Sequence, residues 1–271
     1  LYWKLSVNGA RNWNRFEKSY DGKDFDGRII GKSLNGIYGY KTEGYFNSQD
    51  EVPFYFNQRE RKMYLHISNV DTYPLSKGDY NIVDVDGDGK ISSKDMVYVG
   101  SSLPKISGGI VNEIRWKNFD MNLSMAYQIG RHMVNPIVKR AIRKDAASMT
   151  GRYIALTFNI NDISFWRNRG DNTKYPRLQE NNRIHFMNVD RDVEKVNWLK
   201  LKTLTIGYSL PKHVTNKIRI NQLRFFVSGE NLFTWTDFSG MDPELTGLTG
   251  GFNGDVYPLP RKYTVGLTLK L

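Results

Sequence analysis

The sequence predicts an all-β fold, an antiparallel transmembrane β-barrel with long outer loops, and three stretches predict it. The last nine residues, 263–271, carry an apolar side chain at every second position, with small or polar residues between them. Segments 119–130 and 204–210 alternate in the same way. Because side chains two residues apart share one face of a strand, each stretch has one apolar and one polar face.

The length of the alternation separates a membrane barrel from a soluble β-sandwich. Strands of globular proteins usually have about 5–6 residues. A strand that crosses a bilayer needs about 9–11 residues. The stretches 119–130 and 263–271 reach that length, with their apolar residues on one face as the lipid-facing side of a barrel requires.

The remaining elements follow from the same patterns. We expect strands where apolar and polar residues alternate and long loops where Asn, Asp, Gly and Lys gather. Short turns at one end and long loops at the other are typical of outer-membrane barrels. The expected elements are a strand at 1–8, a loop at 10–36, a short strand or turn at 37–46, mostly irregular chain at 47–83, a hairpin of 110–116 and 119–130 with its turn at Asn118, an outer loop at 131–196 with a short basic helix at 134–149, a large hairpin of 198–211 and 223–235, and a flexible glycine-rich loop at 247–254.

Composition excludes several classes of protein. No apolar run reaches about 18 residues, so no membrane-spanning helix is expected. The net charge is +11, but the Lys and Arg residues are scattered along the chain, which argues against a nucleic-acid partner. We assign the charge to loops or to an anionic membrane surface. With no cysteine, the chain forms neither disulfides nor cysteine zinc sites.

Residues 84–95 match the calcium loop of an EF-hand at every position but the last. Carboxylates at positions 1, 3 and 5 converge on one cation, and the glycine at position 6 permits the sharp turn. Position 7 supplies a backbone carbonyl, position 9 acts through a water, and position 12 is Asp where sensors have Glu. We therefore expect a structural Ca²⁺ bound weakly, with Kd about 10⁻⁴–10⁻³ M; a solvated acidic turn is the alternative. The expected ligands are Asp84, Asp86, Asp88, Lys90, Ser92 and Asp95.

Segment 165–175 of the expected outer loop is the candidate for contact with a substrate or a lid protein. Trp166 and Tyr175 could stack on a sugar ring or pack on a peptide, although aromatic residues in a loop more often serve packing within the loop. No catalytic residues are expected. The four histidines are isolated in sequence, and neither an HExxH motif nor a G-x-S-x-G elbow occurs.

A series of short motifs runs along nearly the whole chain. They are YGYKTEG at 38–44, GD at 78–79 leading into DVDGDG at 84–89, WKNFD at 116–120, YPRL at 175–178, LKLKTLTIGYSLP at 199–211, GENLF at 229–233, GMDPE at 240–244 and YPLPR at 257–261. In this order they resemble the C-terminal part of a SusC/RagA-type TonB-dependent outer-membrane transporter of Bacteroidetes. Because the first residues already alternate as a strand, we expect the 271 residues to be the C-terminal part of a longer polypeptide, without its plug and N-terminal regions.

The resemblance implies a barrel of about 22 strands with a plugged lumen, in the outer membrane of a Gram-negative cell. It implies import of an oligosaccharide or oligopeptide captured by a SusD-like surface lipoprotein, driven by TonB acting through a region outside this sequence. Residues 1–271 would then supply wall and outer loops and catalyse nothing. Two alternatives stay open: a secreted, calcium-binding, β-rich binding module, and an outer-membrane barrel for adhesion or secretion without TonB coupling.

Overall fold

The structure is a computed structural model that describes residues 1–24, 28–67, 74–135, 163–178, 184, 187–240, 242–245 and 258–270. It divides into two compact units, which are described separately. The sheet unit comprises Leu1–Asn14, Ser101–Met133 and Lys195–Leu271, and the loop unit comprises Arg15–Gly100 and Val134–Glu194.

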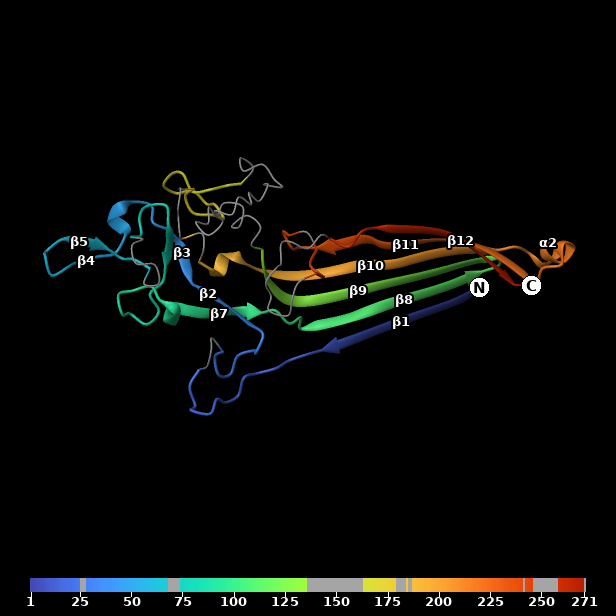
Figure 1. The fold of residues 1–271 in the computed structure, drawn as a ribbon, viewed down its shortest axis with the longest axis horizontal. Coiled ribbons are helices and arrows are strands. Elements are labelled where there is room, and N and C mark those ends of the chain that lie inside the picture. The colour runs from blue at the N-terminus through green and yellow to red at the C-terminus, as the bar shows by residue number, and fades with distance from the viewer. Residues whose placement is uncertain are drawn as a thin grey trace, which may run out of the picture. The chain divides into compact units, whose positions relative to one another are not determined.

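The sheet unit is built on one six-stranded sheet whose strands lie in the order β1-β8-β9-β10-β11-β12 (Figure 1). The pairings β1–β8, β8–β9, β10–β11 and β11–β12 are antiparallel. The strands have 9 to 17 residues, so each reaches the length that crosses a bilayer. The sheet is open, with β1 and β12 at its edges. The bounds are β1 Tyr2–Arg11, β8 Ile106–Trp116, β9 Phe119–Val134, β10 Val193–Ser209, β11 Gln222–Thr236 and β12 Lys262–Lys270.

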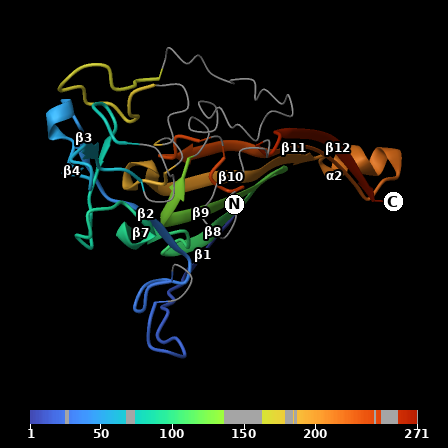
Figure 2. The same cartoon turned by 60° about the vertical axis from the view of Figure 1, so that its left-hand side comes forward.

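Connections at the two ends of this sheet differ in length, as the sequence predicted. Lys117 and Asn118 alone join β8 to β9, and Lys117 has a φ of 52°. The connection from β10 to β11 holds only the short helices α2, Lys212–Thr215, and η7, Asn216–Ile218. The segments between β1 and β8, β9 and β10, and β11 and β12 leave from the opposite end and are much longer. A view turned by 60° keeps the six strands side by side (Figure 2).

In the loop unit, residues 47–83 are mostly irregular, as expected, but those that the structure describes include the short elements η1, β4, β5 and β6. β4 and β5 form a local hairpin, whereas β6 pairs with a strand outside this range. β2 pairs with β7, β3 with β6, and β4 with β5. The bounds are β2 Gly36–Tyr40, β3 Thr42–Tyr45, η1 Gln49–Glu51, β4 Phe54–Phe56, β5 Lys62–Tyr64, β6 Tyr80–Ile82, η2 Ser93–Asp95, β7 Met96–Ser101 and η6 Asp190–Asp192.

The hydrophobic core cluster lies entirely in the loop unit. Leu75, Tyr80, Ile91 and Val189 are completely buried in it. The sheet unit, by contrast, exposes large apolar side chains on each of its six long strands. A soluble β-protein would bury the apolar face of its largest sheet.

The expected outer loop at 131–196 is shorter than predicted, because β9 continues to Val134 and β10 begins at Val193. The basic helix expected at 134–149 and the flexible loop expected at 247–254 fall, apart from residues 134 and 135, outside the described residues. Val134 ends strand β9 rather than beginning a helix. No helix in the described part of the chain is long and apolar enough to cross a bilayer.

Candidate functional site: two faces of a sheet and an ordered loop unit

One face of the six-stranded sheet is apolar and open to its surroundings. On β12 the exposed fractions are 69% for Tyr263, 80% for Val265, 62% for Leu267 and 47% for Leu269. The face continues across neighbouring strands, because Val265 pairs with Val227, which in turn pairs with Ile206. A continuous apolar face of this height is the surface that a lipid bilayer covers.

The opposite face carries polar and charged side chains. The Arg224 guanidinium donates from Nε to Oδ1 of Asp120 at 2.8 Å and from a terminal nitrogen to Oδ2. Thr205 and Ser228 share a hydrogen bond of 2.8 Å between their hydroxyl oxygens. These groups need water or each other, so this face suits a hydrated lumen.

The GMDPE segment is tied to the LKLK segment of β10 by ion pairs. Lys200 is 2% exposed, and its Nζ lies 2.9 Å from Asp242 Oδ2 and 2.8 Å from Glu244 Oε2. Lys202 Nζ donates to the other Glu244 oxygen at 2.6 Å. Two motifs about 40 residues apart therefore act as one structural unit that fixes the chain beyond β11.

A second ion pair joins two further motifs inside the loop unit. Asp79 is completely buried, and its Oδ1 accepts a hydrogen bond of 3.1 Å from Arg177 Nε. Burial raises the pKa of Asp79, while the Arg177 charge and the hydrogen bonds from Ser76 act in the opposite direction. Gly78, with a φ of 84°, lies directly under the Trp166 ring, where any Cβ would collide with it.

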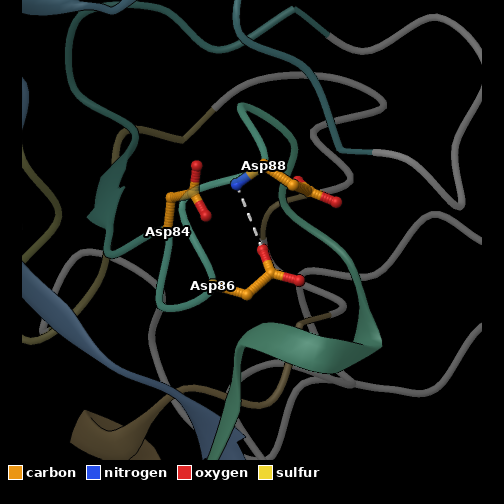
Figure 3. A group of neighbouring side chains, drawn as sticks. All are labelled: Asp84, Asp86 and Asp88. Carbon is orange, nitrogen blue, oxygen red and sulfur yellow. Dashed lines mark hydrogen bonds between the residues drawn. The ribbon is translucent and has the colours of Figure 1, made fainter.

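The acidic loop brings three of the expected ligands together. Ligand oxygens of Asp84, Asp86 and Asp88 all lie within 4.8 Å of one another (Figure 3). Backbone N–H groups of Gly89 and Gly87 donate to Asp84, and the bond from Gly89 is the main cause of its lowered pKa. Ile91, which follows the three carboxylates, is completely buried and ties the loop to the core. A cluster of this kind can hold a hard cation through oxygen ligands.

Asp95 and Ser92 occupy different positions from the three clustered carboxylates. Asp95 Oδ1 accepts from the Val85 N–H at 2.8 Å, and Oδ2 accepts from the Ser92 N–H at 2.7 Å. The Ser92 hydroxyl accepts from the Lys94 N–H at 3.2 Å, which forms a capping box around η2. Asp95 therefore fixes the shape of the loop. The predicted ligand roles of Lys90, Ser92 and Asp95 stay predictions.

Trp166 and Tyr175 are both buried, with 7% of each residue exposed. The Trp166 backbone N–H donates to the Tyr175 backbone carbonyl at 3.0 Å. Burial and the nearby carboxylates Asp192 and Glu194 raise the pKa of the Tyr175 phenol to about 12. This environment favours packing within the loop unit, and contact with a substrate or lid protein stays a prediction.

Sequence reasoning missed a more exposed aromatic surface, the hairpin of β4 and β5, which we call the aromatic hairpin (residues 54–64). Phe54, Tyr55 and Phe56 are all exposed. Lys62 Nζ lies 4.1 Å from the Phe54 ring centroid, and Arg59 and Arg61 flank the turn. The signal was the run FYFNQRERKMY, in which aromatic and cationic residues are concentrated.

The sheet and its two faces define a class: an antiparallel β-sheet of the outer-membrane barrel type, with extended loops. The chain is 28% identical over 99% of its length to TonB-dependent receptor P3 of Formosa agariphila. It is 20% identical, again over 99% of its length, to TonB-dependent receptor SusC of Bacteroides thetaiotaomicron. These relatives confirm the resemblance to SusC/RagA-type TonB-dependent transporters. The chain spans 26% of the length of receptor P3 and 24% of the length of SusC.

Solved structures support the same fold. The chain matches the RagAB peptide transporter with a TM-score of 0.63 and 20% identity, over 98% of this chain and 27% of that one. It also matches the RagAB peptide importer in its open-open state, with a TM-score of 0.58 and 19% identity over 99% of this chain and 27% of that chain. At this identity the matches concern the fold alone. No protein-family model matches the chain.

Proposed function

We propose that this chain forms wall and outer loops of an outer-membrane, TonB-dependent importer of oligosaccharides or oligopeptides. One observation carries the proposal: the long strands expose their apolar face, while the packed core lies in the loop unit. A bilayer covering the apolar face removes the large exposed surface that a soluble protein would avoid.

In this proposal the polar face of the sheet lines the path of the cargo. Arg224, Asp120, Thr205 and Ser228 satisfy one another. They therefore remain polar at a hydrated surface without holding a transported molecule tightly. TonB, powered by the proton gradient across the inner membrane, would open that path through a plug.

The aromatic hairpin fits the role of a contact for a SusD-like surface lipoprotein. Protein interfaces are enriched in aromatic residues and Arg. An isolated two-stranded ribbon is also only marginally stable in water. Exposed Phe54, Tyr55 and Phe56 on such a ribbon would be stabilised by a partner.

The acidic loop would hold a structural Ca²⁺. Asp84, Asp86 and Asp88 supply clustered oxygen ligands. The Lys90 carbonyl and, through a water, Ser92 would complete the set. Asp95 contributes by fixing the loop around that cluster. The ion would neutralise three like charges and stabilise this part of the loop unit.

Uptake by cells tests the transport proposal. Cells producing the full-length protein would be given fluorescent oligosaccharides and oligopeptides, with and without a protonophore that collapses the inner-membrane gradient. We expect uptake of one class, and its loss with the protonophore or on deletion of the lipoprotein gene. Uptake that survives the protonophore would contradict TonB coupling, and a protein absent from the outer-membrane fraction would contradict the location.

A further inference from the structure

Four aromatic rings, which we call the aromatic row, cross the apolar face of the sheet unit at its short-turn end. Trp116 of β8 pairs with Phe119 of β9, whose ring centroid lies 4.7 Å from that of Tyr208 on β10. Tyr208 pairs with Phe225 on β11, which pairs with Leu267 of the exposed β12 face. Each of the four aromatic residues is exposed, by 37% to 54%. Such rows form the aromatic girdles of outer-membrane barrels, so this row marks a boundary between lipid and water.

Two connections of the chain lie next to the aromatic row and are fixed to each other. Asn118, in the turn from β8 to β9, donates from Nδ2 to the Ser209 carbonyl at 2.7 Å, and its own carbonyl accepts from the Ser209 N–H at 2.8 Å. Ser209 is the last residue of β10, so the longer connection to β11 begins beside this turn. Figure 1 shows α2, in that connection, beyond the strand ends on the same side.

The two connections carry cations and no acidic residue. Segments 115–119 and 195–229 contain neither Asp nor Glu. Asp120, directly after the first segment, is already bound by Arg224. This end of the sheet therefore has an excess of positive charge that an anionic partner would neutralise. The four exposed cations of the connections, which we call the basic end, are Lys117, Lys212, Lys217 and Arg219.

Lys117 links the basic end to the lipid-facing side of the sheet. Its Nζ lies 5.2 Å from the centroid of the Trp116 ring, within the range of a cation–π contact. Because Trp116 belongs to the aromatic row, the ammonium group lies beside the apolar face and not over the polar face. A lysine at such a boundary keeps its apolar stem along lipid and its charge among polar headgroups.

We propose that the basic end binds anionic phospholipids of the membrane leaflet that faces the periplasm. Outer-membrane barrels direct their short connections to the periplasm. The lipid phosphate would accept hydrogen bonds from Lys117 and from the cations of the β10–β11 connection, and the acyl chains would lie along the aromatic row. Charge-assisted bonds to phosphate are stronger than neutral ones. Each Lys or Arg near an anionic membrane surface strengthens binding by about fivefold.

The position of Lys117 favours a lipid over an acidic protein of the periplasm. Both would neutralise the cations of the basic end. Only a lipid also covers the aromatic row, because its phosphate and its acyl chains belong to one molecule. The contact between Lys117 and Trp116 places a cation at the point where those two parts of a phospholipid meet.

Retained lipids test the inference, which rests on the proposed membrane location. The full-length protein in mild detergent would be incubated with equal amounts of phosphatidylglycerol and phosphatidylcholine, washed, and its lipids counted by mass spectrometry. We expect a preference for phosphatidylglycerol of at least tenfold. Equal retention by a folded protein would overturn this inference alone and favour a protein partner. A protein that leaves the membrane in buffer without detergent would overturn the proposed function as well.

Free phosphate is the other source of the same chemistry. Inorganic phosphate at about 10 mM should lower the preference no more than sodium chloride of equal ionic strength does, because it has no acyl chain to lie on the aromatic row. A larger loss with phosphate than with chloride would assign the basic end to a free anion and overturn the lipid.

Paired substitutions locate the lipid. Lys117→Asn combined with Lys212→Gln should lower the preference at least fivefold, whereas arginine at both positions should keep it. Asn suits position 117, where φ is 52°. The matched control combines Lys105→Gln with Lys195→Gln, two exposed lysines at the long-loop end of the sheet, and should behave as the wild type does. Equal preferences in the first pair and in this control would overturn the inference.

Discussion

Arg224 on β11 forms a two-pronged ion pair with Asp120 on β9, although β10 lies between these strands. The pair is possible because the residue beneath it on β10 is Gly207. Any Cβ at that position would collide with the guanidinium. The ring of Phe226 covers Gly266 on β12 in the same way. Glycines on the polar face thus leave room for long side chains to lie across the neighbouring strand, and at Gly207 this lets β11 reach β9, with which it does not pair.

Replacing Gly207 tests this connection. Gly207→Ala should displace Arg224 and destabilise the protein by roughly 1 kcal/mol, the scale of a partly exposed ion pair. Asp120→Ala should cost about the same, and the double variant little more than either, because both changes remove one interaction. Urea unfolding in detergent, followed by the mobility of unheated samples on gels, measures the three values. Full additivity would contradict the coupling.

Replacing Lys200 or Lys202 by methionine should destabilise the protein by different amounts. Lys200→Met leaves Asp242 buried without its cation, which should destabilise the docked GMDPE segment by about 3–5 kcal/mol. Lys202→Met removes a partly exposed pair and should cost below about 1 kcal/mol. Thermal unfolding of the two variants side by side provides the comparison. Equal costs would mean that Lys200 is not the main attachment.

The long strands could be predicted from sequence because their information is local. Alternation in 263–271 gave the position of β12 to within one residue, and Asn118 marked the turn between β8 and β9. The loop unit could not be predicted in this way. Tyr40 forms a bridge with Val189, and Asp79 binds Arg177 about 100 residues later, and such partners leave no periodic signal.

The candidate site residues also differ in whether local sequence or the fold of the loop unit determines their position. The spacing of Asp84, Asp86 and Asp88 lies within one turn, so sequence placed them together correctly. Exposure of Trp166 and Tyr175 depends on the fold of the whole loop unit, where Gly78 provides the surface under the Trp166 ring. Composition alone could therefore not show that the exposed aromatic residues are those of the aromatic hairpin.

If the acidic loop binds calcium, removing the charge of its carboxylates should abolish calcium binding. Calorimetric titration of the full-length protein should give one site with Kd about 10⁻⁴–10⁻³ M. The triple variant Asp84→Asn, Asp86→Asn, Asp88→Asn should abolish it. Asp50→Asn, at an exposed acid in η1, is the control and should bind as the wild type does. Unchanged binding by the triple variant would place the ion elsewhere.

Tyr175 predicts a loss of stability at alkaline pH. Its pKa rises from the ordinary value of about 10 to about 12 in the folded protein. The folded state therefore holds the phenolic proton more tightly than the unfolded state does. The stabilisation of the folded state that comes from this raised pKa is complete below pH 10 and is lost as the pH rises toward 12. At about 1.4 kcal/mol per pKa unit, the loss reaches up to roughly 3 kcal/mol.

Tyr175→Phe supplies the comparison, because phenylalanine has no proton to lose. The difference in unfolding free energy between wild type and Tyr175→Phe should be constant up to pH 10 and fall above it. A difference that does not change between pH 9 and 12 would show that the Tyr175 phenol is not shielded from water.

The most direct test of the membrane-facing sheet is thiol accessibility along β12. The 271 residues contain no cysteine. Single cysteines can therefore be placed at positions 263–270 of a full-length protein otherwise free of cysteine, in outer-membrane vesicles. A charged maleimide should label positions 264, 266 and 268 and spare 263, 265 and 267, which a lipid-soluble maleimide should label instead. Equal labelling of both sets by the charged reagent would contradict a lipid-covered face.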